Sequence, residues 1–218
     1  MIFTKQLLTT LALSTLFSAC TPLNIADTGM FDDLSDLKSH VVKGEDINFQ
    51  DKNGETALIN SVLFGNFENV KYLLDNGARV DIKNSDGENA FFNLFIFDKP
   101  EDKKIFDLLM AKGVDVNEKN KYGATALSYA LGSGLAKHVA MLLDKGANIN
   151  INDAEGDSIL SEICTIDSIE KSKAVVDVLV AKNIDLNLKD SEGYTLSDYN
   201  ICAEDKELFA YLKAKGLK

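Results

Sequence analysis

Short alternating runs of polar and apolar residues recur along the chain, and each is followed by apolar residues at helical spacing. In Asp46-Ile47-Asn48 and Asp115-Val116-Asn117 one apolar residue stands between two polar ones, and 79–81, 148–150 and 185–187 repeat the pattern. This alternation predicts a short extended segment with a single side chain turned inward. The pattern therefore predicts one structural unit used several times.

Two series of glycines give the period of that unit. Successive members of both series are separated by 33 residues, with the same additions of three and four residues in the second and fourth intervals. The first series is Gly54, Gly87, Gly123, Gly156 and Gly193, and the second is Gly44, Gly77, Gly113, Gly146, Asn183 and Gly216. Because two series share one phase, the chain is predicted to be a repeat array.

Each glycine series has its own structural meaning. The second series is expected to end helices, because glycine, or Asn183 in its place, adopts the left-handed conformation found after a helix C-terminus. The first series is expected to form turns. Two residues after each turn glycine comes a side chain able to cap a new helix: Thr56, Asn89, Thr125, Ser158 and Thr195.

Two of these helix starts, Thr56-Ala57-Leu58 and Thr125-Ala126-Leu127, resemble the Thr-Pro-Leu-His signature of the ankyrin repeat, although proline and histidine are absent. Gly65 and Gly134 match the glycine between the paired helices of that family, and 70–74 and 139–143 match its second-helix core. The resemblance implies an all-α solenoid of helix-turn-helix units with short β-hairpin-like fingers. It is weaker in the second and fourth repeats, where insertions fall at 97–102 and 165–170.

The resemblance divides nearly the whole chain into parts. An ankyrin-repeat domain is predicted over 31–218, preceded by a short polar tether at 20–30 and a signal peptide at 1–19. The predicted units are a leading half repeat and five repeats, and the charged helix pair of the last repeat would act as the cap that a repeat stack needs. Their bounds are 31–44, 45–77, 78–113, 114–146, 147–183 and 184–216.

The N-terminus predicts export. Leu7 to Phe17 is an apolar run too short to span a bilayer, which needs roughly 20 residues, but it suits a cleaved signal. Ser18-Ala19-Cys20 resembles the bacterial lipobox, with Phe17 where leucine is usual, and this implies lipidation of Cys20. Thr21 then favours the outer membrane, facing the periplasm. The alternative, an ordinary secretory signal cut after Ala19, remains open.

The net charge of the chain indicates which class of macromolecule it is suited to bind. The 218 residues include 34 acidic and 23 basic side chains, and removal of 1–19 would take away Lys5 as well. Nucleic acid is a poor partner for so acidic a chain, whereas a basic protein is better matched. Apart from the lipid anchor itself, an anionic membrane surface is equally disfavoured.

Residues able to carry catalysis or hold a metal are few. His40 and His138 lie about three repeats apart, and each is expected to be a partly buried helix residue. No zinc, phosphate-loop or calcium-loop motif is present, so we expect no cofactor, no metal and no enzyme. An enzyme would require the two insertions to meet in a pocket.

Two cysteines remain after Cys20. Cys164 and Cys202 occupy adjacent steps of neighbouring first helices, in a compartment that permits disulfides. A bond between them or two buried thiols are both compatible with the spacing of stacked helices.

The resemblance implies that a monomer binds a protein partner through turn tips and exposed parts of first helices. The candidates are the apolar residues Leu63, Phe64, Ile96 and Phe97 and the tip residues Glu55, Glu88, Tyr122, Asp157 and Tyr194. For the apolar set the alternative is core packing, and for the acids it is solubility. Bacterial relatives suggest an immunity protein or an accessory factor for an envelope enzyme. A general envelope scaffold without a single client is the other hypothesis.

Overall fold

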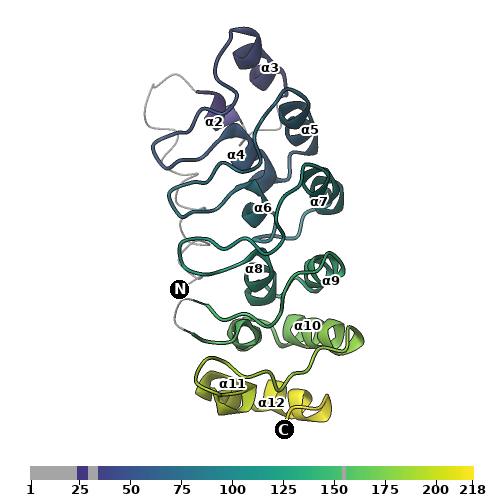
Figure 1. Ribbon diagram of the computed structural model, residues 1–218. Coiled ribbons are helices and arrows are strands. Elements are labelled where there is room, and N and C mark those ends of the chain that lie inside the picture. The colour runs from purple at the N-terminus through teal and green to yellow at the C-terminus, as the bar shows by residue number, and fades with distance from the viewer. Residues whose placement is uncertain (1–23, 29–33, 154–155) are drawn as a thin grey trace.

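The computed structural model describes residues 24–28, 34–153 and 156–218, which form a stack of helix pairs. One column holds the first helix of each pair and a second column holds the second helix, with loops projecting on the far side of the first column (Figure 1). The first column contains α2 (Ile25–Thr28), α4 (Ala57–Phe64), α6 (Ala90–Asn93), α8 (Ala126–Gly132), η1 (Ile159–Thr165), and η2 (Leu196–Asp198) with α11 (Asn200–Glu204). The second contains α3 (Leu34–Val42), α5 (Phe67–Asp75), α7 (Asp102–Ala111), α9 (Ala136–Asp144), α10 (Ile169–Ala181) and α12 (Lys206–Ala214).

Side-chain caps fix where the first helices begin. Thr56 Oγ1 accepts a hydrogen bond from Ile59 N at 3.2 Å, and Asn89 Oδ1 accepts one from Phe91 N at 3.0 Å. Thr125 and Ser128 cap α8 reciprocally. Every glycine of the two series has a positive φ, and so does Asn183 at 57°. The caps and helix ends therefore lie where the glycine period placed them.

The loops between one helix pair and the next form the fingers, defined here as 46–55, 79–88, 115–124, 148–157 and 185–194. Adjacent fingers are joined by backbone hydrogen bonds: Ser85 N to Asn53 O at 2.9 Å, Lys121 N to Asp86 O at 3.2 Å and Ser191 N to Gly156 O at 3.2 Å. Within the described residues the fingers contain no strand, only one antiparallel bridge between Asn152 and Ser158. The architecture is the expected all-α solenoid.

The N-terminal boundary differs from the prediction. Residues 25–28 were expected to belong to a polar tether, but they form α2, whose Ile25 and Ala26 are fully buried. Asn60 Nδ2 in α4 donates to Ala26 O at 3.0 Å. Since α4 would otherwise expose an apolar face, α2 covers it as the first helix of a leading pair. The leading unit therefore contains both helices, and residues 25–28 belong to the stack.

The first helices of the last two repeats are not regular α-helices. α4 and α8 are regular α-helices, whereas η1 is a 3-10 helix and the last unit splits its first helix into η2 and α11. The apolar core nevertheless continues through them, with Ile159, Leu160, Leu196 and Cys202 all buried. The first helices of the last two repeats are thus less regular than those of repeats one and three.

Candidate functional site

The acidic residues at the finger tips do not all face solvent. Glu88, predicted to contact a partner, is only 1% exposed. The Tyr129 hydroxyl of α8 donates to its carboxylate, and Asn120 Nδ2 of the next finger donates to Glu88 Oε1 at 3.1 Å. Burial and the charge of Glu88 raise the pKa of Tyr129 far above its usual range. The prediction for Glu88 is therefore wrong, because the next repeat covers this side chain.

Glu55 occupies the same finger position one repeat earlier. It is half-buried, and its Oε1 accepts a hydrogen bond from Asn84 Nδ2 at 2.9 Å. Glu55 and Glu88 thus hold the turn of the following finger in the same way. In the sequence, this role is indicated by an amide residue at the next turn, which is Asn84 for Glu55 and Asn120 for Glu88.

The other three tip candidates are exposed. Tyr122 and Tyr194 have exposed fractions of 49% and 52%. The Tyr122 hydroxyl donates to Asp86 Oδ1 at 3.1 Å, and Lys121 Nζ lies 4.9 Å from the Tyr122 ring centroid. Asp157 is also exposed, and Tyr199 of the last repeat donates to its carboxylate at 3.3 Å. These tips are accessible and are held in place by their neighbours.

The apolar candidates form what we call the apolar edge: Leu63 and Phe64 at the end of α4, and Ile96 and Phe97 in the segment that follows α6. Phe64 and Phe97 are 36% and 37% exposed, while Leu63 and Ile96 are half-buried. The four other phenylalanines of repeat two, Phe91, Phe92, Phe95 and Phe106, are fully buried. Of the four candidates, Ile96 packs against the core as the alternative expected, while Phe64 and Phe97 keep their rings in contact with solvent.

A finger row carries the remaining recurrent apolar residues: Phe49, Ile82, Ile151 and Leu188, with Glu118 at the equivalent place in repeat three. Phe49 is exposed and the three aliphatic residues are half-buried. Glu118 forms an ion pair with Lys83 at 2.7 Å and accepts a hydrogen bond from Asn89 Nδ2 at 2.5 Å. Of the row, Ile151 and Leu188 pack against the core, and Glu118 contacts the preceding repeat through Lys83 and Asn89.

The insertions of repeats two and four fold back over the preceding repeat. A Cβ on Gly65 would lie 2.7 Å from Lys99 Cδ, and one on Gly134 would lie 2.9 Å from Lys171 Cβ. Both glycines also have a positive φ. Glycine is needed at these two turns because the insertion of the following repeat lies against the backbone. The insertions thus cover the inter-helix edge, and they lie two repeats apart.

Under the first insertion lies a buried polar cluster. His138 in α9 and Asp102 at the start of α7 are 2% and 3% exposed, with His138 Nε2 3.0 Å from Asp102 Oδ2. Lys99 Nζ lies 3.7 Å from Asp102 Oδ1, and burial lowers the pKa of Lys99 despite the two nearby carboxylates. His138 is thus fully buried and not partly buried. Sequence reasoning missed the pairing because 36 residues separate Asp102 from His138.

Charge is distributed unevenly between the two sides of the stack. The described residues of the five fingers include 13 acidic and 6 basic side chains. The five second helices α5, α7, α9, α10 and α12 include 8 of each sign. Most of the net negative charge of the stack therefore lies toward the fingers and away from the second helices.

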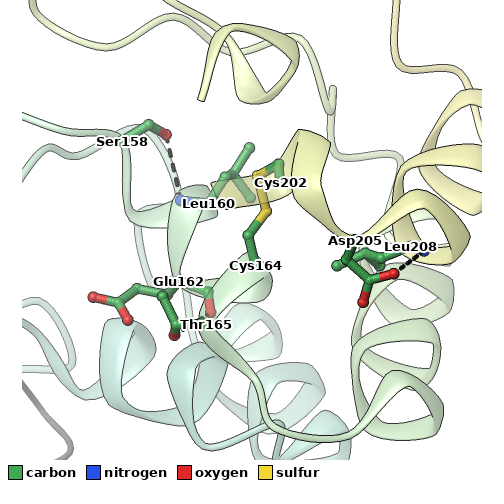
Figure 2. The surroundings of a disulfide bond; sticks show 8 residues. All are labelled: Ser158, Leu160, Glu162, Cys164, Thr165, Cys202, Asp205 and Leu208. Atoms are coloured by element: carbon green, nitrogen blue, oxygen red, sulfur yellow. Dashed lines mark hydrogen bonds between the residues drawn. A yellow bond between two sulfur atoms is a disulfide. The ribbon is translucent and has the colours of Figure 1, made fainter. Parts of the chain in front are cut away.

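A disulfide joins the last two repeats. Cys164 in η1 and Cys202 in α11 are bonded, with their Cα atoms 5.0 Å apart, as Figure 2 shows. Cys202 is fully buried and Cys164 is half-buried. The bond thus joins the 3-10 helix η1 to the split first helix of the last repeat. Cys20 lies outside the described residues.

None of the helices in the described part of the chain is long and apolar enough to cross a membrane.

Comparison with known proteins gives consistent matches. A family model for ankyrin repeats in three copies matches residues 23–94 and 97–190. Among curated proteins, a putative ankyrin repeat protein of fowlpox virus is 28% identical over 115 residues, which are 53% of this chain and 26% of that protein. The ankyrin repeat domain-containing protein SAT10 of Stachybotrys chartarum is 32% identical over 114 residues, 52% of this chain and 6% of that protein. This chain thus spans only a small part of these two relatives.

Two solved structures share the whole architecture. An ankyrin repeat domain from Acinetobacter baumannii superposes with a TM-score of 0.71 at 24% identity, covering 89% of this chain and 98% of that one. A chain from the complex of the predatory endopeptidase Bd0816 of Bdellovibrio bacteriovorus with the immunity protein Bd3460 superposes with a TM-score of 0.71 at 26% identity. That match covers 88% of this chain and 98% of the other.

Proposed function

The chain belongs to the ankyrin-repeat family, whose repeats are protein-interaction modules, and on that premise we propose a non-catalytic binding protein tethered to a bacterial envelope. Its partner is an exported or envelope protein with a basic surface. The observation that carries this proposal is the charge asymmetry of the stack, with 13 acidic and 6 basic residues on the fingers. Opposite charge on a partner raises the rate of encounter and selects its orientation.

The proposed contact surface combines charge with apolar anchors. The exposed tips Tyr122, Asp157 and Tyr194 lie on the acidic finger side, and the exposed rings Phe64 and Phe97 lie at the apolar edge. Aromatic anchors surrounded by a polar rim are common in protein interfaces. Likeness to a chain from an endopeptidase–immunity protein complex supports an immunity role as one example, with an accessory role for an envelope enzyme as another.

Two features support export. Residues 1–20 have the signal and lipobox pattern described above. The bond between Cys164 and Cys202 is of the kind that persists in oxidising compartments. We place the protein on the periplasmic side of the envelope, anchored through lipid on Cys20 in the outer membrane.

Replacing Cys20 with serine tests the anchor. We expect the wild-type protein to incorporate a labelled fatty acid and to sediment with outer membranes, because several acyl chains make a durable anchor. The C20S variant should lose both the label and the sedimentation. Wild-type protein found unlabelled in the soluble periplasmic fraction would instead support the ordinary secretory signal cut after Ala19.

Charge reversal at the fingers tests the binding surface. In a pull-down from bacterial envelopes, we expect the double variant D157K/E192K to retain a basic partner at least about tenfold less well than the wild type, or about 1.4 kcal/mol. Raising the salt concentration should have the same effect, because the screening length falls from about 10 Å at 0.1 M to about 3 Å at 1 M. Retention of one stoichiometric partner would favour a dedicated binder over a general scaffold.

The matched control is the double variant E68K/D107K, which changes the net charge equally on exposed positions of α5 and α7. It should retain the partner as the wild type does. Equal losses in both double variants would show that net charge alone governs binding and would contradict a finger-side contact. Many weak partners, unaffected by either variant, would favour the scaffold.

A further inference from the structure

Three buried polar atoms without a hydrogen-bond partner gather beneath the insertion of repeat two. They are Asp102 Oδ1, His138 Nδ1 and Lys99 Nζ, of which Asp102 Oδ1 and Lys99 Nζ face each other at 3.7 Å as an ion pair. Buried polar atoms in proteins are almost always satisfied, and an exception commonly marks an ordered water or ion. The side chains of Asp102 and His138 are both more than nine-tenths buried. This small region is therefore where the described structure most calls for an additional ligand.

The geometry of the cluster suits a metal ion. Asp98, Asp102 and His138 each offer one ligand atom, and the three atoms lie within 4.8 Å of one another. His138 Nε2 and Asp102 Oδ2 are 3.0 Å apart. Two ligands bound tetrahedrally at about 2.0–2.2 Å from zinc lie about 3.3–3.5 Å from each other. A metal could thus bind between this nitrogen and this oxygen, and it would share Asp102 Oδ2 with the backbone N–H of Lys99, which donates to that oxygen at 2.7 Å.

The surroundings of the cluster give an ion a path from solvent and include a lysine that competes with it for Asp102. Asp98 is exposed, so an ion can reach the cluster from the solvent side while the other two ligands stay buried. The Lys99 ammonium lies 3.7 Å from Asp102 Oδ1 and is the cation closest to that oxygen among the pairs described. A bound metal must displace it, and the long side chain of lysine allows that movement.

We propose that Asp98, Asp102 and His138 form a binding site for a divalent transition metal of the zinc class, with Lys99 as the competing cation. An imidazole nitrogen with carboxylate oxygens is a ligand set that zinc accepts, and magnesium and calcium prefer oxygen ligands alone. The site links the insertion of repeat two to α9 of repeat three. A bound metal would therefore fix the segment that carries Phe97 at the apolar edge.

The test is metal titration of the full mature chain, purified in the oxidised form and without a histidine tag. Oxidation keeps Cys164 and Cys202 from binding zinc as thiolates. We expect ZnCl₂ to raise the unfolding temperature relative to EDTA, and Co²⁺ to develop a visible absorption band on binding. MgCl₂ at the same concentration should change neither quantity.

Variants separate this site from adventitious binding. Asp98→Asn alters an exposed ligand outside the core and should weaken zinc binding at least about tenfold without changing the stability in EDTA. Lys99→Met should strengthen zinc binding, because it removes the competing cation. Asp107→Asn, an exposed acid on the same helix α7, should leave binding unchanged. The absence of a zinc effect in the wild type, or an equal effect in D98N, would overturn the proposal.

Discussion

Reduction of the bond between Cys164 and Cys202 is expected to lower the free energy of unfolding by about 2–4 kcal/mol. The bond closes a loop with a sequence separation of 38 residues, and its loss restores conformational freedom to the unfolded chain. The loss should be concentrated in the last two repeats, because η1, η2 and α11 are short and irregular and receive less support from their own helical hydrogen bonds.

Chemical denaturation with and without a phosphine reductant measures this effect. The control is the double variant C164A/C202A, in which the reductant should change nothing. Hydrogen exchange should show lost protection in 159–217 while α4 to α9 keep theirs, since each repeat contacts only its neighbours. A reductant effect of equal size in the variant would rule out the disulfide as its cause.

Replacing Glu88 with alanine is expected to destabilise the protein by about 2–4 kcal/mol. The substitution leaves the Tyr129 hydroxyl and Asn120 Nδ2 without the carboxylate that accepts from both, and unsatisfied buried donors cost about 1–3 kcal/mol each. Asp157→Ala, at the same finger position of repeat four but exposed, should cost much less.

A double-mutant cycle identifies the interaction responsible. If the hydrogen bond from Tyr129 carries the effect, Tyr129→Phe in the Glu88→Ala background should cost less than it does in the wild type. Glu88→Gln retains an acceptor oxygen and should fall between the wild type and Glu88→Ala. Equal costs for the alanine substitutions at residues 88 and 157 would show that burial of Glu88 contributes little.

The repeat architecture was predictable because it depends on local backbone chemistry. Positive φ at Gly77 or Asn183 and side-chain capping at Thr56 are properties of single positions, and their period defines the stack. Contacts between repeats were less predictable. The roles of Glu55 and Glu88 depend on the side chain that the next repeat brings to them. The acidic residue alone does not show whether it is exposed or covered, and the sequence signal is the later amide, Asn84 or Asn120.

The N-terminal unit and the buried cluster also depend on contacts between repeats, which the sequence does not display. The four residues of α2 are too few for a periodic pattern, and they fold because α4 offers an apolar surface to cover. Asp102 and His138 come from different repeats, and each alone resembles an ordinary helix residue. Packing between units, and not local propensity, determines what these residues do.

If Cys20 carries lipid as proposed, the position of α2 limits how far the stack can move from the membrane. Only 21–23 separate the proposed lipid-bearing Cys20 from Asn24, and four extended residues span at most about 13–14 Å. This connecting segment is shorter than the thickness of two layers of stacked helices at 8–10 Å each. On the proposed anchor, the leading pair would stay at the lipid surface and a captured partner would be held there with it. A partner confined to the same leaflet would then meet the fingers at a raised effective concentration.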